Sequence, residues 1–332
     1  MKKTLLTICL VWMCFSLSAQ KIIDLSGKWS FSIDRQDNGE KEKWFSHTLN
    51  DFINLPGSMP EKLKGDEVTA KTQWTGSLYD SSYYYNPYME KYRKEGNIKF
   101  PFFLTPDKHY VGAAWYQKEV NIPADWKGER ILLFLERPHI ETTVWVNGQK
   151  TGMQNSLCVP HQYDITRYVR PGKCTITIRV DNRIKEINVG PDSHSITDQT
   201  QGNWNGIVGR ICLQTTPKTY FDDIQIYPEP EQKLARVKVV IKGTGTAKVK
   251  LSAESFNTDK KHIVPAIQQE IKLNKGVTET EMVLPMGNDM LLWDEFHPAL
   301  YKLKAEVTNG KKTEIKEIPV SYTHLRAHET DQ

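Results

Sequence analysis

The stretch Thr143-Val144-Trp145-Val146-Asn147-Gly148 joins a short apolar strand to an Asn-Gly pair, a strong hairpin signal. Further along, residues 175–180 alternate polar and apolar side chains, which puts the apolar ones on one face of a strand. Residues 131–135 form a continuous apolar run that suits a strand buried on both faces. Short strands at this spacing, with turn residues between them, predict an all-β fold built from sandwiches.

Outward from this region, the same patterns divide the chain into domains. Residues 28–33 alternate with period two, so we predict that one sandwich spans residues 21–217. In the remainder, residues 236–241 and 247–253 alternate strictly on either side of a Gly-Thr-Gly turn. About 100 residues of such short strands predict an immunoglobulin-like sandwich over residues 218–320.

Composition narrows the function classes. A chain of 332 residues is expected to hold about two domains. Its 44 Lys and Arg residues nearly balance 40 Asp and Glu residues, and the basic residues are dispersed. A nucleic-acid partner is therefore not expected, because such binding needs a basic face. The aromatic fraction of 10% argues against disorder as the main state.

The first 20 residues resemble a secretory signal peptide. Lys2 and Lys3 precede an apolar run over residues 5–15, and small residues at 16–19 suit cleavage. The run is too short for a membrane span. We expect an exported protein, periplasmic or extracellular, with no membrane contact after cleavage.

Three cysteines remain after such cleavage. Cys158, Cys174 and Cys212 are widely spaced and odd in number, which argues against a disulfide framework. Cys174 and Cys212 lie in apolar runs and are expected to be buried thiols. No Cys/His spacing suggests zinc, so we expect no metal and no cofactor.

The candidate substrate-binding residues lie in the loop Gly-Asn-Trp-Asn-Gly-Ile-Val-Gly-Arg, residues 202–210. Asn203 and Asn205 offer amide donors and acceptors, and Trp204 offers a flat apolar ring, which together suit the hydroxyl edges and C–H face of a sugar. The open alternative is an ordinary turn before a strand. Arg210 could meet a substrate carboxylate or form a cross-strand or interface salt bridge.

An atypical segment, residues 67–110, is rich in Tyr, Phe and Trp and has little helical or strand periodicity. Long loops of this kind are often functional. The segment could present rings to a saccharide as a lid or wall, or its rings could pack the loop onto its own domain.

Several motifs in order resemble the amino-terminal domains of glycoside hydrolase family 2, which includes β-galactosidases and β-glucuronidases. The motifs are Leu25-Ser26-Gly27-Lys28-Trp29, Ala114-Trp115-Tyr116, Val144-Trp145-Val146-Asn147-Gly148, Tyr163-Asp164-Ile165-Thr166 and Asn203-Trp204-Asn205-Gly206-Ile207. The resemblance implies a sugar-binding jelly roll, a following immunoglobulin-like domain, and a Trp204 loop that edges the pocket of a catalytic barrel. Several relatives carry a carboxylate before this aromatic residue. Here Gly202 and Asn203 stand before it, so the loop is not expected to bind a metal or a charged substrate.

No catalytic residues are expected in this chain. A retaining glycosidase needs two carboxyls about 5 Å apart, and in this family they lie on a barrel of about 250 residues. Only 12 residues follow Val320, and residues 321–332 resemble translated sequencing-adapter read-through, a non-native tail. Asp294 and Glu295 are adjacent, and neighbouring side chains on a strand point to opposite faces.

Two hypotheses follow. The chain is either the non-catalytic amino-terminal portion of an exported, retaining exo-β-glycosidase or a complete, non-enzymatic carbohydrate-binding protein of two domains. In the first case it meets its saccharide through the missing barrel, and the full enzyme is open to forming a homo-oligomer.

Overall fold

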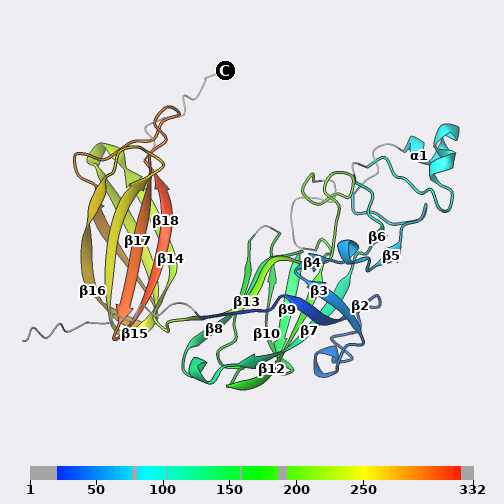
Figure 1. Cartoon of the computed structure of the whole chain (residues 1–332), viewed down its shortest axis with the longest axis horizontal. Helices are drawn as coiled ribbons and strands as arrows, with labels where there is room; N and C mark the ends of the chain where they lie inside the picture. Colours follow the sequence, from blue (N-terminus) through cyan, green and yellow to red (C-terminus); the bar gives the residue numbers. More distant parts are fainter. Residues whose placement is uncertain (1–20, 77–80, 103, 158, 186–192, 323–332) are drawn as a thin grey trace, which may run out of the picture. The chain divides into compact units, whose positions relative to one another are not determined.

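The computed structural model describes residues 21–76, 81–102, 104–157, 159–185 and 193–322 (Figure 1). They form two compact units that meet in sequence between residues 216 and 217. The signal-peptide and tail predictions fall largely on residues 1–20 and 323–332, which lie outside the described part, as does Cys158. No described helix is long and apolar enough to cross a membrane.

The first unit is a jelly-roll sandwich of antiparallel strands. One sheet has the order β1 (Ile22–Asp24), β13 (Gly206–Thr216), β8 (Arg130–Pro138), β11 (His161–Asp164), with β4 (Gly57–Ser58) also on β13. The other has the order β10 (Gln149–Asn155), β9 (Glu141–Val146), β12 (Gly172–Asp181), β7 (Ala113–Ile122), β2 (Gly27–Asp34), β3 (Asp51–Leu55). The all-β prediction is confirmed.

The hairpin predicted at residues 143–148 forms. β9 ends at Val146 and β10 begins at Gln149. Asn147 has φ 50° and Gly148 has φ 76°. A type I′ turn requires positive φ at both central residues, which Asn and Gly adopt at the lowest cost. The Asn-Gly pair therefore sets the register of this sheet edge.

The core lies between the two sheets. Trp29, Tyr116 and Ile178 from one sheet meet Leu133 and Leu213 from the other, all almost fully buried. Each such side chain contributes about 1.5–3 kcal/mol through removal of its apolar surface from water. The apolar residues of the strand predicted at 175–180 face this core.

The second face of the β12 sheet is covered as well. Trp115 and Trp145 lie there at 5.0 Å between ring centroids, and Phe45 stacks on Trp145 at 5.2 Å. Trp44 and Leu49 complete this smaller cluster. The segment between β2 and β3 thus closes the outer face, so polar residues of β12 on that face are also buried.

The second unit is the immunoglobulin-like sandwich. Its strands follow the order β14 (Tyr220–Glu229), β15 (Leu234–Phe256), β17 (Leu300–Asn309), β18 (Lys312–Ser321), and β16 (Ile263–Pro285) pairs with β15. Ser321 ends β18 and Tyr322 is buried against Tyr301, so these two residues, which the sequence placed in the tail, pack with this unit.

The predicted turn at Gly243-Thr244-Gly245 is wrong. β15 continues through it as one strand, and the pairing with β16 shifts register between Gly243 and Gly245. The half of β15 before this point pairs with β14, and the half after it pairs with β17. The glycines therefore lie at a register shift in the middle of β15, where its second neighbour changes from β14 to β17, as a bulge allows.

The aromatic segment forms short elements at one end of the first unit. β5 (Asp66–Glu67) pairs with β6 (Lys108–His109), and between them lie α1 (Ser82–Tyr85) and the 3-10 helix η3 (Pro87–Tyr92). Figure 1 shows α1 set apart from the two sheets, beyond β5 and β6.

Candidate functional site

The loop that carries Trp204 leads directly into β13 at the end of the jelly roll. Gly206 has φ 145°, and a Cβ atom there would lie 2.5 Å from the carbonyl oxygen of Gly57. Only glycine permits this close approach of two backbones. The Met59 amide donates to the carbonyl of Asn205 at 2.7 Å, and Gly206 pairs with Ser58. The end of the loop is therefore hydrogen-bonded to β4 and to the residue that follows it.

Asn205 is fully buried, and its amide is satisfied inside the domain. Its Nδ2 donates to the carbonyls of Gly112, at 2.9 Å, and Val180, at 3.0 Å. Its Oδ1 accepts from the hydroxyl of Tyr116 at 2.7 Å. Burial raises the pKa of that tyrosine well above its usual range, so the hydroxyl remains a donor. Asn205 therefore braces the loop from within.

Asn203 has a similar internal role. Its Nδ2 donates to the Thr75 hydroxyl and to the Asn182 carbonyl, both at 3.0 Å. Its Oδ1 accepts from Nδ2 of Asn182, again at 3.0 Å. Asn182 is itself fully buried and donates to the carbonyl of Tyr110. Both asparagines were predicted to bind substrate, and the structure places both amides in hydrogen bonds within the protein.

Asp198 is the residue that the sequence reasoning missed. It is 2% exposed, and its Oδ1 accepts from the Asn203 amide at 2.6 Å. Its Oδ2 accepts from the Thr75 amide at 2.6 Å and lies 3.2 Å from Nε2 of His109. The aromatic segment and the Trp204 loop are joined through this carboxylate. Its only signal in the sequence is an acidic residue five positions before Asn203, whereas the family pattern has its carboxylate directly before the aromatic residue.

Trp204 is the partly exposed member of the predicted trio. Its ring stacks on His139, with 4.5 Å between centroids and 15° between planes. His139 is 7% exposed, and burial lowers its pKa to about 4, so the imidazole is neutral near pH 7. A neutral ring can serve as a flat support, so the stack fixes the plane that Trp204 presents. Substrate binding by this loop stays a prediction.

The His139 site makes stability depend on pH. Its pKa is about 6.5 in the unfolded chain and about 4 in the folded one. The unfolded state thus binds more protons between these values, and stability falls as pH drops through that window, by about 3 kcal/mol. We expect His139→Phe, which keeps a stacking ring, to lose less stability in urea unfolding between pH 6.5 and 4. Equal losses in both proteins would contradict this assignment.

Arg210 forms a cross-strand pair. Its Nε donates to Oε2 of Glu136 at 3.0 Å, and its guanidinium lies 5.2 Å from the Phe134 ring centroid. The side chain remains 76% exposed. This is the salt-bridge alternative of the two that the sequence left open.

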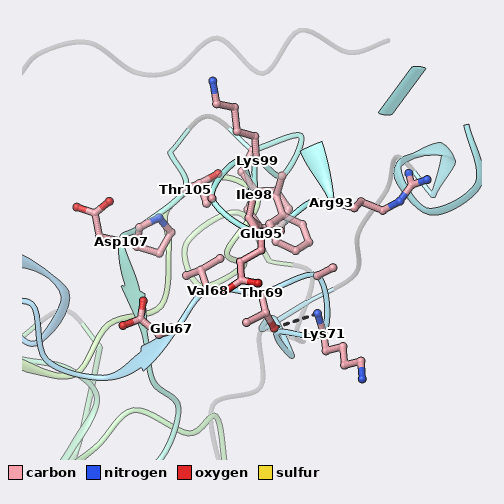
Figure 2. A pocket seen from close by; sticks show the side chains of 15 residues that line it. Glu67, Val68, Thr69, Lys71, Arg93, Glu95, Ile98, Lys99, Thr105 and Asp107 are labelled. Atoms are coloured by element: carbon pink, nitrogen blue, oxygen red, sulfur yellow. Dashed lines mark hydrogen bonds between the residues drawn. The ribbon is translucent and has the colours of Figure 1, made fainter. Parts of the chain in front are cut away.

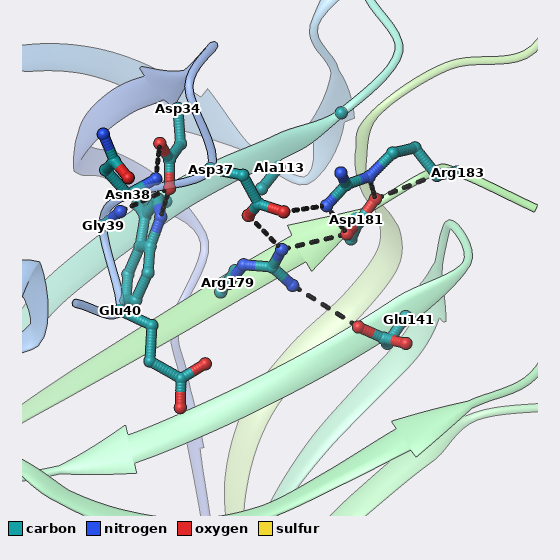
Figure 3. Close-up of polar contacts among 12 residues, drawn as sticks. Asp34, Asp37, Asn38, Gly39, Glu40, Ala113, Glu141, Arg179, Asp181 and Arg183 are labelled. Carbon is teal, nitrogen blue, oxygen red and sulfur yellow. Dashed lines mark hydrogen bonds and ion pairs between the residues drawn. The ribbon is translucent and has the colours of Figure 1, made fainter. Parts of the chain in front are cut away.

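Six ionic side chains meet where β12 ends, and we call them the Arg179 cluster: Asp37, Glu141, Arg179, Asp181, Arg183 and Lys185. Figure 3 labels all of them except Lys185. Arg179 lies 2.6 Å from Asp37, 3.0 Å from Asp181 and 3.4 Å from Glu141. Three cations and three carboxylates balance. Hydrogen bonds from Arg183 and Lys185 overcome the cost of burial and hold the pKa of the Asp181 carboxyl well below its usual range.

The cluster holds the end of the strand that precedes the Trp204 loop. Asp181 closes β12, Asn182 follows it, and Asn182 is the partner of Asn203. The sequence showed Arg179 as a polar residue of an alternating strand, with nothing to indicate that both faces of that strand are covered.

The adjacent carboxylates noted in the sequence are turn and surface groups. Asp294 accepts from the backbone amides of Phe296 and His297. Asp222, in a second adjacent pair with Asp223, pairs with Lys242 at 2.9 Å. Among the described residues, no group of three or more His, Cys, Asp or Glu side chains could hold a metal ion.

The chain therefore consists of a jelly-roll domain, which carries the braced loop, followed by an immunoglobulin-like domain. Residues 22–217 match the model described as glycosyl hydrolases family 2, sugar binding domain, and residues 219–322 match the model described as glycosyl hydrolases family 2. The chain belongs to glycoside hydrolase family 2, as its motifs predicted.

Curated relatives share low identity over most of this chain. The Homo sapiens β-glucuronidase is 24% identical over 319 residues, which are 86% of this chain and 41% of the relative. A Clostridium acetobutylicum β-galactosidase is 24% identical over 311 residues, 91% of this chain and 31% of the relative. The chain thus spans less than half the length of these relatives.

Solved structures show the same fold. A β-glucuronidase from an uncultured Clostridium superposes with a TM-score of 0.58 at 19% identity, over 91% of this chain and 45% of that one. The Ruminococcus gnavus β-glucuronidase gives 0.57 at 18% identity, over the same shares.

Proposed function

We propose that this chain is the non-catalytic amino-terminal portion of an exported, retaining exo-β-glycosidase. Its two sandwiches would brace a catalytic barrel, and its Trp204 loop would shape the wall of the sugar pocket. The observation that carries the proposal is that this chain matches both family models in order. The chain covers only 41% and 31% of two relatives, a β-glucuronidase and a β-galactosidase. Holding a substrate in position is itself a contribution to catalysis.

The braced loop supports this role. Asn203, Asn205 and Asp198 fix the loop by internal hydrogen bonds, and the His139 ring supports Trp204 from behind. A pocket wall needs such a rigid backing, because a misplaced contact to the terminal sugar weakens binding in the transition state. The sugar would be a β-glucuronide or β-galactoside by analogy with the named relatives.

The complete two-domain binder is the second candidate. The loop obtains all of the hydrogen bonds described above from its own domain, without help from another module. Such a loop could bind a saccharide unaided. Reading the gene beyond codon 320 separates the candidates: an in-frame stop favours the binder, and an open frame with barrel periodicity favours the enzyme.

The enzyme proposal is tested by activity in two arms. The purified chain should not hydrolyse nitrophenyl β-glucuronide or β-galactoside, whereas the full gene product should. In the full product, Trp204→Ala should lower kcat/KM by the equivalent of about 1–3 kcal/mol, the scale of lost stacking and hydrogen bonding. Arg210→Ala is the exposed control. Turnover by the chain alone would overturn the proposal, and unchanged kinetics with a lowered Tm would make Trp204 a structural residue.

A further inference from the structure

The cleft in the aromatic segment is formed by rings that cover one another. It has a volume of about 1030 Å³ and lies within residues 67–107 of the first unit (Figure 2). Phe100, which lines it, is 5% exposed and lies between Phe102, at 5.6 Å, and Tyr83, at 4.7 Å, measured between ring centroids. These rings pack the segment together. By contrast, an apolar ring that faces solvent lies in the second unit.

Phe296 lies in the loop between β16 and β17 and is 81% exposed, the highest value among the large apolar side chains described in the second unit. Residues 293–298, which form the turn that carries it, are called the Phe296 turn. The turn is closed by an isolated bridge between its first and last residues. Within it, the Asp294 carboxylate accepts from the amides of Phe296, at 2.8 Å, and His297, at 2.7 Å. A ring on a backbone fixed in this way loses little entropy when a partner covers it.

The Phe296 turn lies where the chain leaves the second unit. The Trp293 amide donates to the carbonyl of Tyr322 at 2.9 Å, and Tyr322 is 1% exposed, so this exit is fixed to the turn. The chain enters the unit at the other end of β17, where Asn309 donates to the Thr219 hydroxyl just before β14. A segment that follows Tyr322 therefore begins next to the Phe296 turn.

Two more open apolar side chains belong to the same end of the unit. Phe256 pairs with the first residue of β17 and is 36% exposed. Ile263 is the first residue of β16 and is 59% exposed. The loop between them is tied to the Phe296 turn, because Nδ2 of Asn257 donates to the carbonyl of Pro298 at 2.8 Å. Figure 1 shows the loop between β16 and β17 at the end of the unit where β18 finishes.

The surroundings of these three side chains are those of an interface. Scattered single apolar residues are normal on a protein surface, whereas a group of them rimmed by polar residues marks an interaction site. The same two loops carry exposed charges of both signs: Asp259, Lys260, Lys261 and Glu295. An aromatic anchor inside a polar rim is the usual arrangement at protein interfaces.

We propose that the Phe296 turn is the anchor by which the second unit docks onto the catalytic barrel that follows it, with Phe256 and Ile263 beside it. The proposal rests on the proposed function, which supplies the barrel, and goes beyond it by naming the contact. The chain covers 41% of the human β-glucuronidase, so a relative has ample chain outside the matched part to cover this surface. Phe296 enters an apolar pocket of the barrel, and the charged side chains around it stay in water.

Thiol labelling of Phe296→Cys tests this proposal in two proteins, the purified chain and the full gene product. Iodoacetamide is the probe, and peptide mass spectrometry gives the labelling rate at position 296. We expect labelling to be about tenfold or more slower in the full product, since a thiol covered by a partner must wait for local opening. The matched control is Lys311→Cys, an exposed position in the turn between β17 and β18 at the other end of the unit, which should label equally fast in both proteins.

A second variant measures what the contact contributes. Phe296→Ala should lower the Tm of the full gene product and leave that of the purified chain unchanged, because the ring is exposed in the chain alone. Equal labelling of Phe296→Cys in the two proteins overturns the proposal. Protection that disappears on dilution of the full product also overturns it, because a second copy would then be the cover.

Failure of the docking proposal can be told apart from failure of the proposed function. Turnover of nitrophenyl glycosides by the wild-type full product tests the function alone. An active product that labels freely at position 296 overturns only the docking, and an inactive product that is protected there overturns only the glycosidase. An in-frame stop directly after codon 322 overturns both.

Discussion

Replacing Arg179 by Met is expected to lower the free energy of unfolding of the jelly roll by about 3–5 kcal/mol. The guanidinium is the central cation of the Arg179 cluster and contacts Asp37, Glu141 and Asp181. Removal leaves three carboxylates with two cations, and Asp181 is fully buried. Arg183 and Lys185 still contact these carboxylates, but one negative charge of the cluster is left uncompensated. Breaking a buried ion network in this way costs far more than the intact network contributes, which is why the loss should be large.

Urea unfolding followed by circular dichroism measures this loss. Arg210→Met is the matched control, since it removes an arginine whose pair with Glu136 is exposed, and such pairs contribute about 0–1 kcal/mol. A loss in Arg179→Met no larger than in Arg210→Met would show that the cluster is not a buried network.

Asn205→Ala is expected to destabilise the same unit by about 3–5 kcal/mol. The variant leaves the carbonyls of Gly112 and Val180 and the hydroxyl of Tyr116 without their partner. Each buried polar group left unsatisfied costs about 1–3 kcal/mol, and water entering the small space would offset part of the sum.

The same unfolding experiment tests Asn205. Its control is Asn97→Ala, whose amide makes one exposed hydrogen bond to the carbonyl of Lys91, so the change in stability should stay within about 0.5 kcal/mol. Wild-type stability in Asn205→Ala would mean that the amide is free to face a ligand, as the sequence argument had it.

The strand pattern was readable because it depends on local chemistry. The turn after Val146 needs positive φ at both central positions, and Asn147 and Gly148 adopt it at low cost. This preference does not depend on the rest of the fold. The alternation in β12 likewise predicted its core face. The turn prediction at Gly243-Thr244-Gly245 was wrong because a glycine with positive φ, as at Gly245, serves both a turn and a bulge. Which of the two forms depends on the strands that lie alongside.

The sequence indicated a candidate loop, residues 202–210, but not which of its side chains are buried. A loop of amides and a tryptophan indicates polar recognition, and only tertiary contacts decide whether an amide meets a ligand or a carbonyl. Asn205 reaches carbonyls from β12 and from the residue before β7, distant in sequence. The roles of Asp198 and His139 could not be predicted for the same reason, because their partners come from other segments of the chain.

The amino-acid sequence alone determined two sandwiches, their order, and the family through motifs spread over the first domain, because hydrophobic period and turn chemistry act over a few residues. Tertiary structure alone decided which polar groups are buried: it paired Arg179 with three carboxylates, turned Asn203 and Asn205 inward, and left Trp204 partly open on a neutral histidine. The reason is that burial and hydrogen-bond partners are properties of packed segments, and no single segment carries them.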